Sequence, residues 1–215
     1  MHPDASEGAD MTLSASGMGT PIEVALIAAG GTGPGTPGLA LAIGTAVVGE
    51  ITSHAIVPFG ALVAAGAAVT GTSIVTNLDA DRLKVPLRAA LISAGAADIT
   101  KTTVFATDLA TAIVGEISTF ASIPGTGFVA PPAGGPVTGA STVSGLNAVR
   151  LAIPVLAAFV TAALPGEAAP IPTATLALAI ALAIVLEIAT NGVVPGGALV
   201  APGGGGPLTG ATVIT

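Results

Sequence analysis

Apolar stretches that each end in one glutamate recur three times along the chain. The glutamates lie in the segments Gly49-Glu50-Ile51, Gly115-Glu116-Ile117 and Leu186-Glu187-Ile188. Their spacings are 116 − 50 = 66 and 187 − 116 = 71 residues. Self-similarity at a fixed period indicates repeated structural units. The pattern therefore predicts three tandem repeats of roughly 70 residues each.

The predicted repeats comprise residues 12–77, 78–144 and 145–215. A unit of this size is near the limit at which a separate hydrophobic core is stable. We therefore expect the three units to share one core and to be arranged with pseudo-threefold symmetry. Residues 1–11 contain three acidic residues and no Lys or Arg. This segment predicts a mobile acidic tail and does not match a signal peptide.

A first helix is predicted in each repeat next to a proline: Pro21, Pro86 and Pro154. In the first repeat, Thr20-Pro21-Ile22-Glu23 matches a capping box in which Thr20 is the N-cap. A residue before proline avoids the helical region. The other two helices are therefore expected to begin at the proline or within one turn of it. Short extended segments are expected to precede the helices, at 13–19, 78–81 and 146–149.

A second helix is predicted over residues 39–51, 109–117 and 176–188, where Ala, Leu, Ile and Val dominate. Residues such as Leu109 and Ile113 lie at i and i+4 and share one face. The third of these helices is apolar on nearly every face. A helix of that kind is normally buried all round. We expect it to lie deepest in the body or to contact another chain.

Each second helix is followed by a loop containing Pro58, Pro124 or Pro195 and then by short runs of β-branched residues bounded by glycine. Such runs favour strands, and they predict a small hairpin or an extended arm in each repeat. The predicted assembly arm consists of Val69, Thr70, Gly71, Val137, Thr138, Gly139, Leu208, Thr209 and Gly210. The predicted fold class is therefore α+β, mainly α.

The Val/Leu-Thr-Gly motif of the arm has two interpretations. It could be a ligand-binding loop that occurs three times. It could also be a strand end where glycine adopts a backbone conformation that other residues avoid. We expect the second, structural role, with the arm pairing to the sheet edge of a neighbouring subunit.

Composition narrows the range of functions. Charged residues make up 8% of the chain, and the net charge is −7. Nucleic-acid binding usually requires clustered Lys and Arg, but the five basic residues all lie between 82 and 150. Three of them, Arg82, Lys84 and Arg88, predict either a solvated helix end or an anionic contact patch. The absence of Cys leaves no disulfide or thiolate metal site.

The high mean hydropathy of +0.91 raises the question of a membrane protein. A membrane-spanning helix needs about 20 consecutive apolar residues. The best candidates, 174–186 and 151–164, are shorter than this, and the second contains Pro154. We therefore expect the apolar surface to be covered by protein rather than by lipid.

The repeated Glu50, Glu116 and Glu187 are the main candidates for a site. If they converged on a pseudo-threefold axis, they could bind a hard cation such as Ca²⁺. They could instead form a buried polar network, or each could face solvent or cap a loop. A carboxylate near a helix C-terminus opposes the helix dipole, so a compensating partner is expected in any case.

Ser53-His54 is a possible nucleophile and base. The corresponding pairs in the other repeats are Thr119-Phe120 and Thr190-Asn191. A position that accepts an aromatic ring or an amide is more typical of a helix end than of a general base. We expect neither catalysis nor a cofactor.

The Ala/Gly/Thr-rich repeats with their Val/Leu-Thr-Gly arms resemble the small accessory structural proteins of tailed-phage virions. The resemblance is compositional and architectural over residues 12–215, and no diagnostic motif contributes to it. It implies a non-catalytic protein in many copies that decorates or cements a capsid, or builds a neck or tail. The implied partners are other copies of the chain or a major capsid or tail protein. The expected location is the virion or another large assembly, and otherwise the cytoplasm.

The competing hypothesis is a membrane channel or proteolipid. Helical hairpins with one carboxylate per repeat are similar to the proton-carrying c subunits of rotary ATPases. Helices of about 15 residues, however, span only about 22 Å of a roughly 30 Å hydrocarbon core. The sequence therefore favours the assembly protein. A secreted adhesive or surface-layer repeat is a third alternative, which no signal segment supports.

Overall fold

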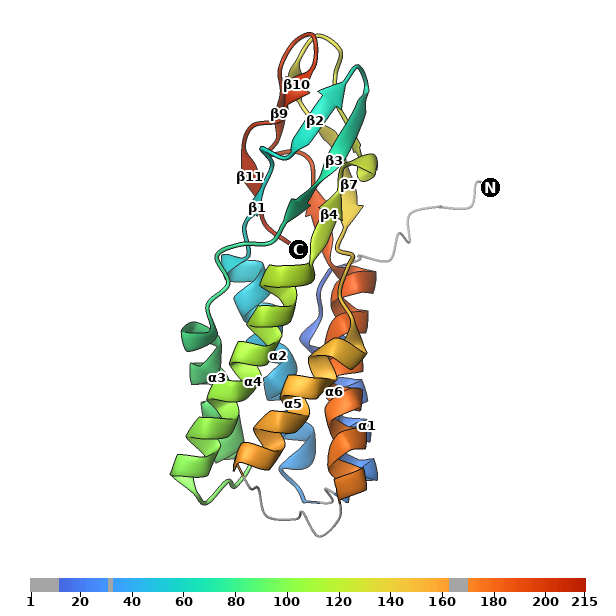
Figure 1. Cartoon of the computed structure of the whole chain (residues 1–215). Helices are drawn as coiled ribbons and strands as arrows, with labels where there is room; N and C mark the ends of the chain where they lie inside the picture. The colour runs from blue at the N-terminus through green and yellow to red at the C-terminus, as the bar shows by residue number, and fades with distance from the viewer. Residues whose placement is uncertain (1–11, 31–32, 163–169) are drawn as a thin grey trace, which may run out of the picture.

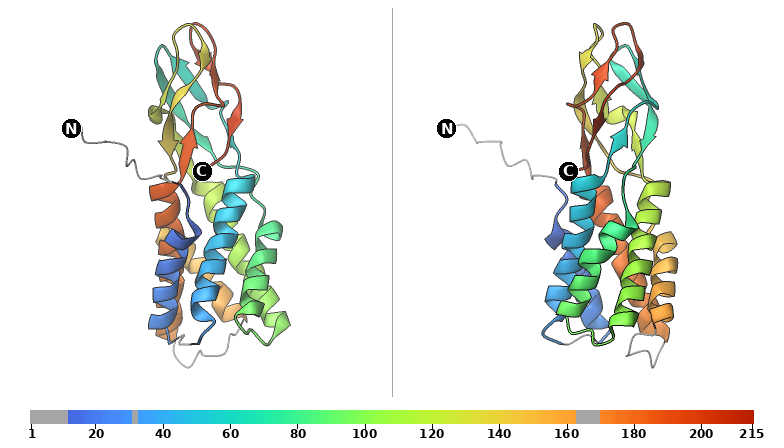
Figure 2. Two further views of the ribbon diagram at one scale, coloured as in Figure 1. Left: turned by 180° about the vertical axis from the view of Figure 1, so that it is seen from behind. Right: turned by 90° about the vertical axis from the view of Figure 1, so that its left-hand side faces the viewer.

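The computed structural model describes residues 12–30, 33–162 and 170–215, and it is α+β. Six α helices form a bundle at one end, and short strands form a narrow tip at the other (Figure 1). Figure 2 shows the same division from two further sides. The predicted class, α+β with mainly helix, is confirmed. The predicted acidic tail, 1–11, lies outside the described residues.

The helices form a closed ring. They are α1 (Ala15–Ala28), α2 (Thr36–His54), α3 (Ala80–Ser93), α4 (Ile99–Phe120), α5 (Ala148–Ala162) and α6 (Pro170–Asn191). Each helix packs against the next one in chain order, and α6 packs against α1. The first and last helices of the chain therefore lie side by side.

The first helix of each predicted repeat begins earlier than the sequence analysis placed it. α1 begins at Ala15, and the hydroxyl of its N-cap Ser14 accepts a hydrogen bond from the N–H of Gly17 (3.1 Å). The capping box at Thr20 is therefore wrong, and Pro21 lies inside the helix. Ser is a strong N-cap, so the helix can start upstream even though the proline removes one helical hydrogen bond.

The other two first helices show the same difference. α3 begins at Ala80 and α5 at Ala148, so Pro86 and Pro154 are both internal. Asp79 and Asn147 cap them, accepting hydrogen bonds from the N–H groups two residues later. Most of the three extended segments predicted before the helices is therefore helical.

The three second helices are confirmed, and they are longer than predicted, at 19, 22 and 22 residues. The expectation that α6 lies deepest is wrong, and its alternative, contact with another chain, stays a prediction. Leu178, Leu182 and Leu186 are 43%, 53% and 58% exposed. They lie four residues apart and form an exposed apolar stripe along α6.

The tip consists of short antiparallel strands. They are β1 (Val57–Pro58), β2 (Leu62–Ala65), β3 (Ala68–Ile74), β4 (Ser122–Pro124), β5 (Phe128–Val129), β6 (Gly135–Pro136), β7 (Thr138–Thr142), β8 (Val193–Pro195), β9 (Val200–Ala201), β10 (Gly206–Pro207) and β11 (Ala211–Thr212). A hairpin occurs where it was predicted: β2 pairs with β3. β5 likewise pairs with β7.

Strands from different parts of the chain close the tip. β3 pairs with β4, β7 pairs with β8, and β11 pairs with β1. In the last pair Thr212, near the C-terminus, lies opposite Val57. β10 also pairs with β2, and β6 with β9. Many strand edges are therefore occupied by other strands of the same chain.

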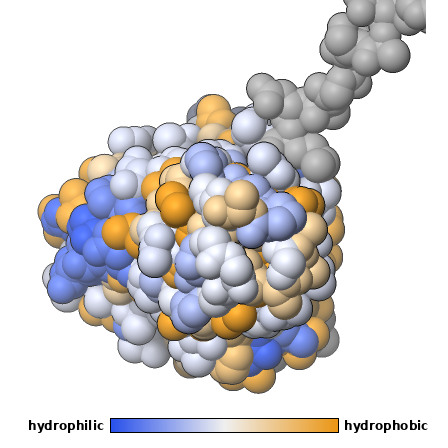
Figure 3. Space-filling view, turned by 90° about the horizontal axis from the view of Figure 1, so that it is seen from above, coloured by the Kyte–Doolittle hydropathy of each residue, from blue (hydrophilic) through white to orange (hydrophobic). Residues whose placement is uncertain are grey.

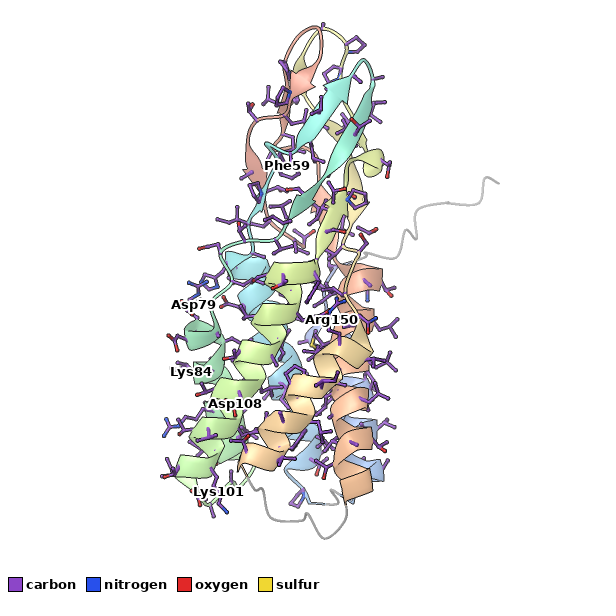
Figure 4. All side chains as sticks on the ribbon, viewed as in Figure 1. Phe59, Asp79, Lys84, Lys101, Asp108 and Arg150 are labelled. Carbon is purple, nitrogen blue, oxygen red and sulfur yellow. The ribbon has the colours of Figure 1, made fainter. Side chains whose placement is uncertain are left out.

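One hydrophobic core runs through the bundle and into the tip. In the bundle it includes Met18 and Leu87, both 0% exposed. In the tip the rings of Phe59 and Phe128 meet edge to face, with centroids 5.9 Å apart. This is a favourable geometry for an aromatic pair. Figure 4 shows Phe59 within the tip.

Candidate functional site

The repeated glutamates are buried in three separate places. Glu50, Glu116 and Glu187 are 7%, 5% and 6% exposed. Among the described residues, no group of three or more His, Cys, Asp or Glu is placed to hold a metal ion. The converging carboxylate cluster considered from the sequence is therefore wrong. The glutamates are buried polar groups, and each has partners of its own.

Each glutamate caps the start of the next first helix around the ring. Glu50 Oε1 accepts from the Asp79 N–H (2.9 Å), and Glu116 Oε1 from the Asn147 N–H (2.8 Å). Glu187 Oε1 accepts from the Ser14 N–H (2.7 Å) and so joins the last helix to the first. We call these contacts the carboxylate seams: the α2/α3 seam, the α4/α5 seam and the α6/α1 seam.

The seams explain how a glutamate is tolerated near the C-terminus of its own helix. That position is unfavourable for a negative charge, whereas the N-terminus of a helix favours one. Each carboxylate lies at the N-terminus of the following helix, where it meets a free backbone N–H. The compensating partner expected from the sequence is thus present at all three seams.

Two seams also contain an arginine. Arg82 Nη2 donates to Glu50 Oε1 (2.9 Å), and Arg150 Nε donates to Glu116 Oε2 (2.8 Å). These hydrogen bonds to a carboxylate raise the pKa of both guanidinium groups. Arg150 also donates to the carbonyl of Gly145 (2.9 Å), so it fixes the connection that leads into α5.

The α6/α1 seam has no arginine. Both arginines lie three residues after the N-cap, since 79 + 3 = 82 and 147 + 3 = 150. The corresponding residue after Ser14 is Gly17. A Cβ atom there would lie 2.4 Å from Glu187 Oε2, so a side chain at this position would collide with the carboxylate. The last seam therefore depends on the backbone hydrogen bond and the α1 dipole.

Sequence reasoning identified the glutamates but missed their arginine partners. The available signal was the spacing of Asp79 to Arg82 and of Asn147 to Arg150, each a helix-capping residue followed three positions later by arginine. This spacing was not recognised because the sequence analysis predicted the helices to begin near Pro86 and Pro154, after both arginines. The sequence also left open that Arg82, Lys84 and Arg88 form a patch that contacts anions. Arg82 and Lys84 are instead paired within the chain, with Glu50 and Asp81.

His54 and the corresponding Phe120 each lie four residues after a seam glutamate, Glu50 or Glu116. His54 Nδ1 lies 3.2 Å from Glu50 Oε2, and the His54 side chain is 41% exposed. The corresponding Phe120 lies under the guanidinium of Arg150, with 3.5 Å from its carbon to the ring centroid. Such a cation–π contact stabilises the arginine. At the α4/α5 seam, the residue at this position therefore contacts the arginine of the ion pair.

The glycines of the predicted arm adopt the left-handed conformation. The φ angles of Gly71, Gly139 and Gly210 are 95°, 85° and 105°. A Cβ atom at each would lie 2.3, 2.4 and 2.5 Å from a carbonyl oxygen of the paired segment. The prediction of a glycine-only conformation is confirmed.

The remaining arm residues lie within the tip. Val69, Val137 and Leu208 are buried in the core, and Thr70, Thr138 and Thr209 are exposed on paired backbone. In the described structure these segments pair within the chain. Their role as an assembly arm stays a prediction.

A groove runs along the outside of the bundle at each seam. The volumes are about 760 Å³ at α2/α3, 780 Å³ at α4/α5 and 590 Å³ at α6/α1. The internal prolines Pro86, Pro154 and Pro21 each line one groove, together with many alanines. The grooves are open and mostly apolar.

The fold and the seams define a class: a closed ring of six helices with a strand tip, joined by buried carboxylates that cap neighbouring helices.

Comparison of the chain with family models, with curated proteins and with solved structures finds no match in any of the three. In the part of the chain that the structure describes, one helical segment, Thr173–Asn191, is long and apolar enough to cross a membrane, and 39% of its apolar stretch is buried inside the protein.

Proposed function

We propose that this chain is a non-catalytic structural protein that self-assembles or decorates a larger symmetric particle. The observation that carries the proposal is the apolar outer surface of the bundle. Large apolar residues are exposed on every helix, among them Val24, Leu41, Val85, Ile99, Ile153 and Leu182. On α6, Leu178, Leu182 and Leu186 form a continuous exposed stripe beside the apolar α6/α1 groove. A contiguous apolar patch of this kind is typical of a surface that contacts another protein.

The distribution of charge supports the same proposal. Glu50 and Glu116 are buried and paired with arginine, so these charges serve the fold. Seen from the tip end, the most hydrophilic residues form a larger group at the left and a smaller one at the lower right, and hydrophobic and paler residues cover the surface between them (Figure 3). The helices α1, α5 and α6 each carry a single charged residue: Glu23, Arg150 and Glu187. This leaves large uncharged faces for contacts with protein.

The proposed architecture is three tandem repeats with pseudo-threefold symmetry and boundaries near 12–77, 78–144 and 145–215. Its support is that comparable contacts recur at corresponding positions. The three glutamates cap three helices in the same way. Three strand pairs join successive repeats: β3–β4, β7–β8 and β11–β1. A body of this kind suits a symmetry axis of a particle such as a virion, as capsid decoration or as a neck or tail part.

A membrane channel or proteolipid is the alternative function. The argument that its helices are too short to span a membrane fails. Because α4 and α6 have 22 residues, each is about 33 Å long, enough for a hydrocarbon core. Charge now favours assembly: α3 carries Lys84 and Arg88, and α4 carries Lys101 and Asp108. Charged residues within a membrane are costly. The arginine-paired Glu50 and Glu116 are also unlike a proton-carrying carboxylate.

Sedimentation velocity without detergent, over a wide range of protein concentrations, tests the proposal. A protein that stays in solution and forms larger species as its concentration rises supports self-assembly. A protein that stays in solution only with detergent contradicts the proposal and favours the channel. A monomer at every concentration contradicts self-assembly and restricts the proposal to decoration of another protein's particle, which co-sedimentation with that particle would test.

A further inference from the structure

Three charged side chains near the middle of the bundle make no ion pair among the described residues: Glu23 of α1, Arg88 of α3 and Asp108 of α4. Arg88 and Asp108 are on adjacent helices, whereas Glu23 is on the far side of the ring. Among the described residues, Asp108 of α4 makes no hydrogen bond or ion pair. Arg88 of α3 makes one hydrogen bond, from Nε to Thr103 Oγ1 (2.9 Å), and no ion pair. The other arginines, Arg82 and Arg150, are both paired with a buried glutamate.

Asp108 lies in an apolar setting. It lines the groove of about 780 Å³ between α4 and α5 together with Ile153, Pro154 and Ala157 of α5. Arg150 also lines this groove, but it is paired with Glu116. The corresponding residues of the other two grooves are Ala42 and Ala179, since 108 − 66 = 42 and 108 + 71 = 179. Asp108 gives this open groove a negative charge with which a cation on an approaching surface can pair. The α4/α5 groove is therefore suited to an apolar ridge that carries one positive charge.

The exposed side of α3 is such a ridge. Val85 is 63% exposed and Ile92 is 40% exposed, and Arg88 lies between them at helical spacing. Helices α3, α4 and α5 lie next to one another in Figure 1, because α3 packs against α4 and α4 packs against α5. The ridge on α3 and the groove between α4 and α5 are therefore on neighbouring parts of the surface. A surface that contains both a ridge and a matching groove can bind a second copy of itself about a two-fold axis.

The two charges also lie at the same height along the bundle. Arg88 is 88 − 79 = 9 residues from Asp79, or about 13 Å along α3. Asp108 is 116 − 108 = 8 residues from Glu116, or about 12 Å along α4. Asp79 and Arg150, the partner of Glu116, both lie at the end of the bundle next to the tip (Figure 4).

We propose that two copies of this chain associate side by side and parallel, with the α3 ridge of each copy in the α4/α5 groove of the other. A two-fold axis parallel to the helices places Arg88 of each copy near Asp108 of its partner, without a shift along the axis. This interface rests on the proposed assembly function and identifies one contact from which an assembly can be built.

The surface of α4 between ridge and groove permits close approach. Thr107 and Thr111 lie there, and their hydroxyls donate to the carbonyls of Thr103 and Thr107 (2.8 Å each). The hydroxyls are therefore satisfied within the helix, which leaves small side chains on this surface. Two α4 helices can approach each other across the axis without leaving a polar group unpaired.

Charge reversal with sedimentation equilibrium of the full chain tests the interface. The monomer has a mass of 20.2 kDa, so the dimer has 2 × 20.2 = 40.4 kDa. Arg88→Glu and Asp108→Arg should each raise the dimer dissociation constant at least about 30-fold, because like charges then meet twice across the axis. The double variant should return it to within about tenfold of the original, because the pair is restored with opposite polarity.

Matched controls separate this effect from a change in net charge. Val24→Glu together with Ile27→Glu lowers the net charge by two, as Arg88→Glu does, at two exposed residues of α1. Glu23→Arg makes the same change as Asp108→Arg on α1, on the far side of the ring from α4. Both controls should leave the dissociation constant within about threefold. Circular dichroism checks that every variant is folded.

Three results would overturn the interface. Association that responds to the reversals no more than to the controls would disprove this surface while the assembly function stands. Weakening by both single reversals without recovery in the double variant would show that Arg88 and Asp108 do not meet. A wild-type protein that remains monomeric at every concentration would contradict both this interface and self-assembly.

Discussion

At the scale of single residues, the glutamates are the most informative side chains. Each accepts a backbone N–H at the start of a neighbouring helix, and two of the three are also paired with arginine. A buried carboxylate is stable only where its charge is matched. The chain therefore allows the contribution of the arginine to be compared directly, because Glu116 is paired with Arg150 and Glu187 has no arginine partner.

Replacing Glu116 by Gln should destabilise the protein by about 1.5–3 kcal/mol, because the buried carboxylate that accepts from Arg150 and from the Asn147 N–H becomes a neutral amide with one acceptor oxygen. Replacing Glu187 by Gln should cost only about 1 kcal/mol, because the amide oxygen can still accept from the Ser14 N–H. Urea unfolding with a constant m-value measures both changes. Equal effects, or a larger effect at Glu187, would show that the arginine is not what matches the charge.

The arm glycines give a second prediction at this scale. Gly139→Ala should destabilise the protein by roughly 2 kcal/mol or more, because φ is 85° and the Cβ would meet the carbonyl oxygen of Gly127. Gly115→Ala is the control, since nothing lies within 4 Å of its Cβ position in α4. The control should stabilise by up to about 1 kcal/mol. Thermal unfolding of both variants provides the test.

The role of a residue could be predicted from the sequence when it depends on the local backbone, and could not when it depends on a partner far away in the sequence. The glycine-only conformation of the Thr-Gly motif was foreseen because it is a property of the local backbone. The arginines at the seams were not, because Arg82 and Glu50 are 32 residues apart and meet only through packing of α2 against α3. Contacts of this kind do not follow from local patterns.

At the scale of elements, the internal prolines are the main departure from expectation. Pro21, Pro86 and Pro154 all lie inside helices, six residues after the first helical residue. The prediction assumed that each proline lies in the first turn of its helix, which proline prefers, and it therefore put the helix starts too far along the chain. Polar N-caps upstream, together with the glutamates of the preceding helices, stabilise the earlier start. The second helices were foreseen because their apolar periodicity is long and uninterrupted.

Pro154→Ala should stabilise α5, because alanine restores an N–H that can donate to the carbonyl of Arg150. The full helix-propensity difference is about 3 kcal/mol, and the greater freedom of the unfolded chain offsets part of it. A net gain of about 1–2 kcal/mol is expected. Urea unfolding measures it. A loss of stability would instead show that the proline ring packs better in the α4/α5 groove than alanine does.

At the scale of the whole molecule, the chain closes on itself at both ends of the body. In the bundle, α6 packs against α1, and Glu187 binds the Ser14 N–H. In the tip, β11 pairs with β1, and the Thr215 N–H donates to the carbonyl of Val193 (2.9 Å). Closure uses the last residues of the chain to complete a ring that begins with the first helix.

Closure of the tip can be measured directly, because the chain has no cysteine. Val57 and Thr212 are opposite each other in β1 and β11, 155 residues apart (212 − 57 = 155), and both are buried on the same side. Opposed residues of an antiparallel pair lie within the range of a disulfide. Oxidation of the double variant Val57→Cys/Thr212→Cys should therefore form an intramolecular disulfide in nearly all molecules, as shown by mass and loss of free thiols. Free thiols that persist in the folded double variant, or cross-links only between chains as in the single-cysteine controls, would contradict a closed body.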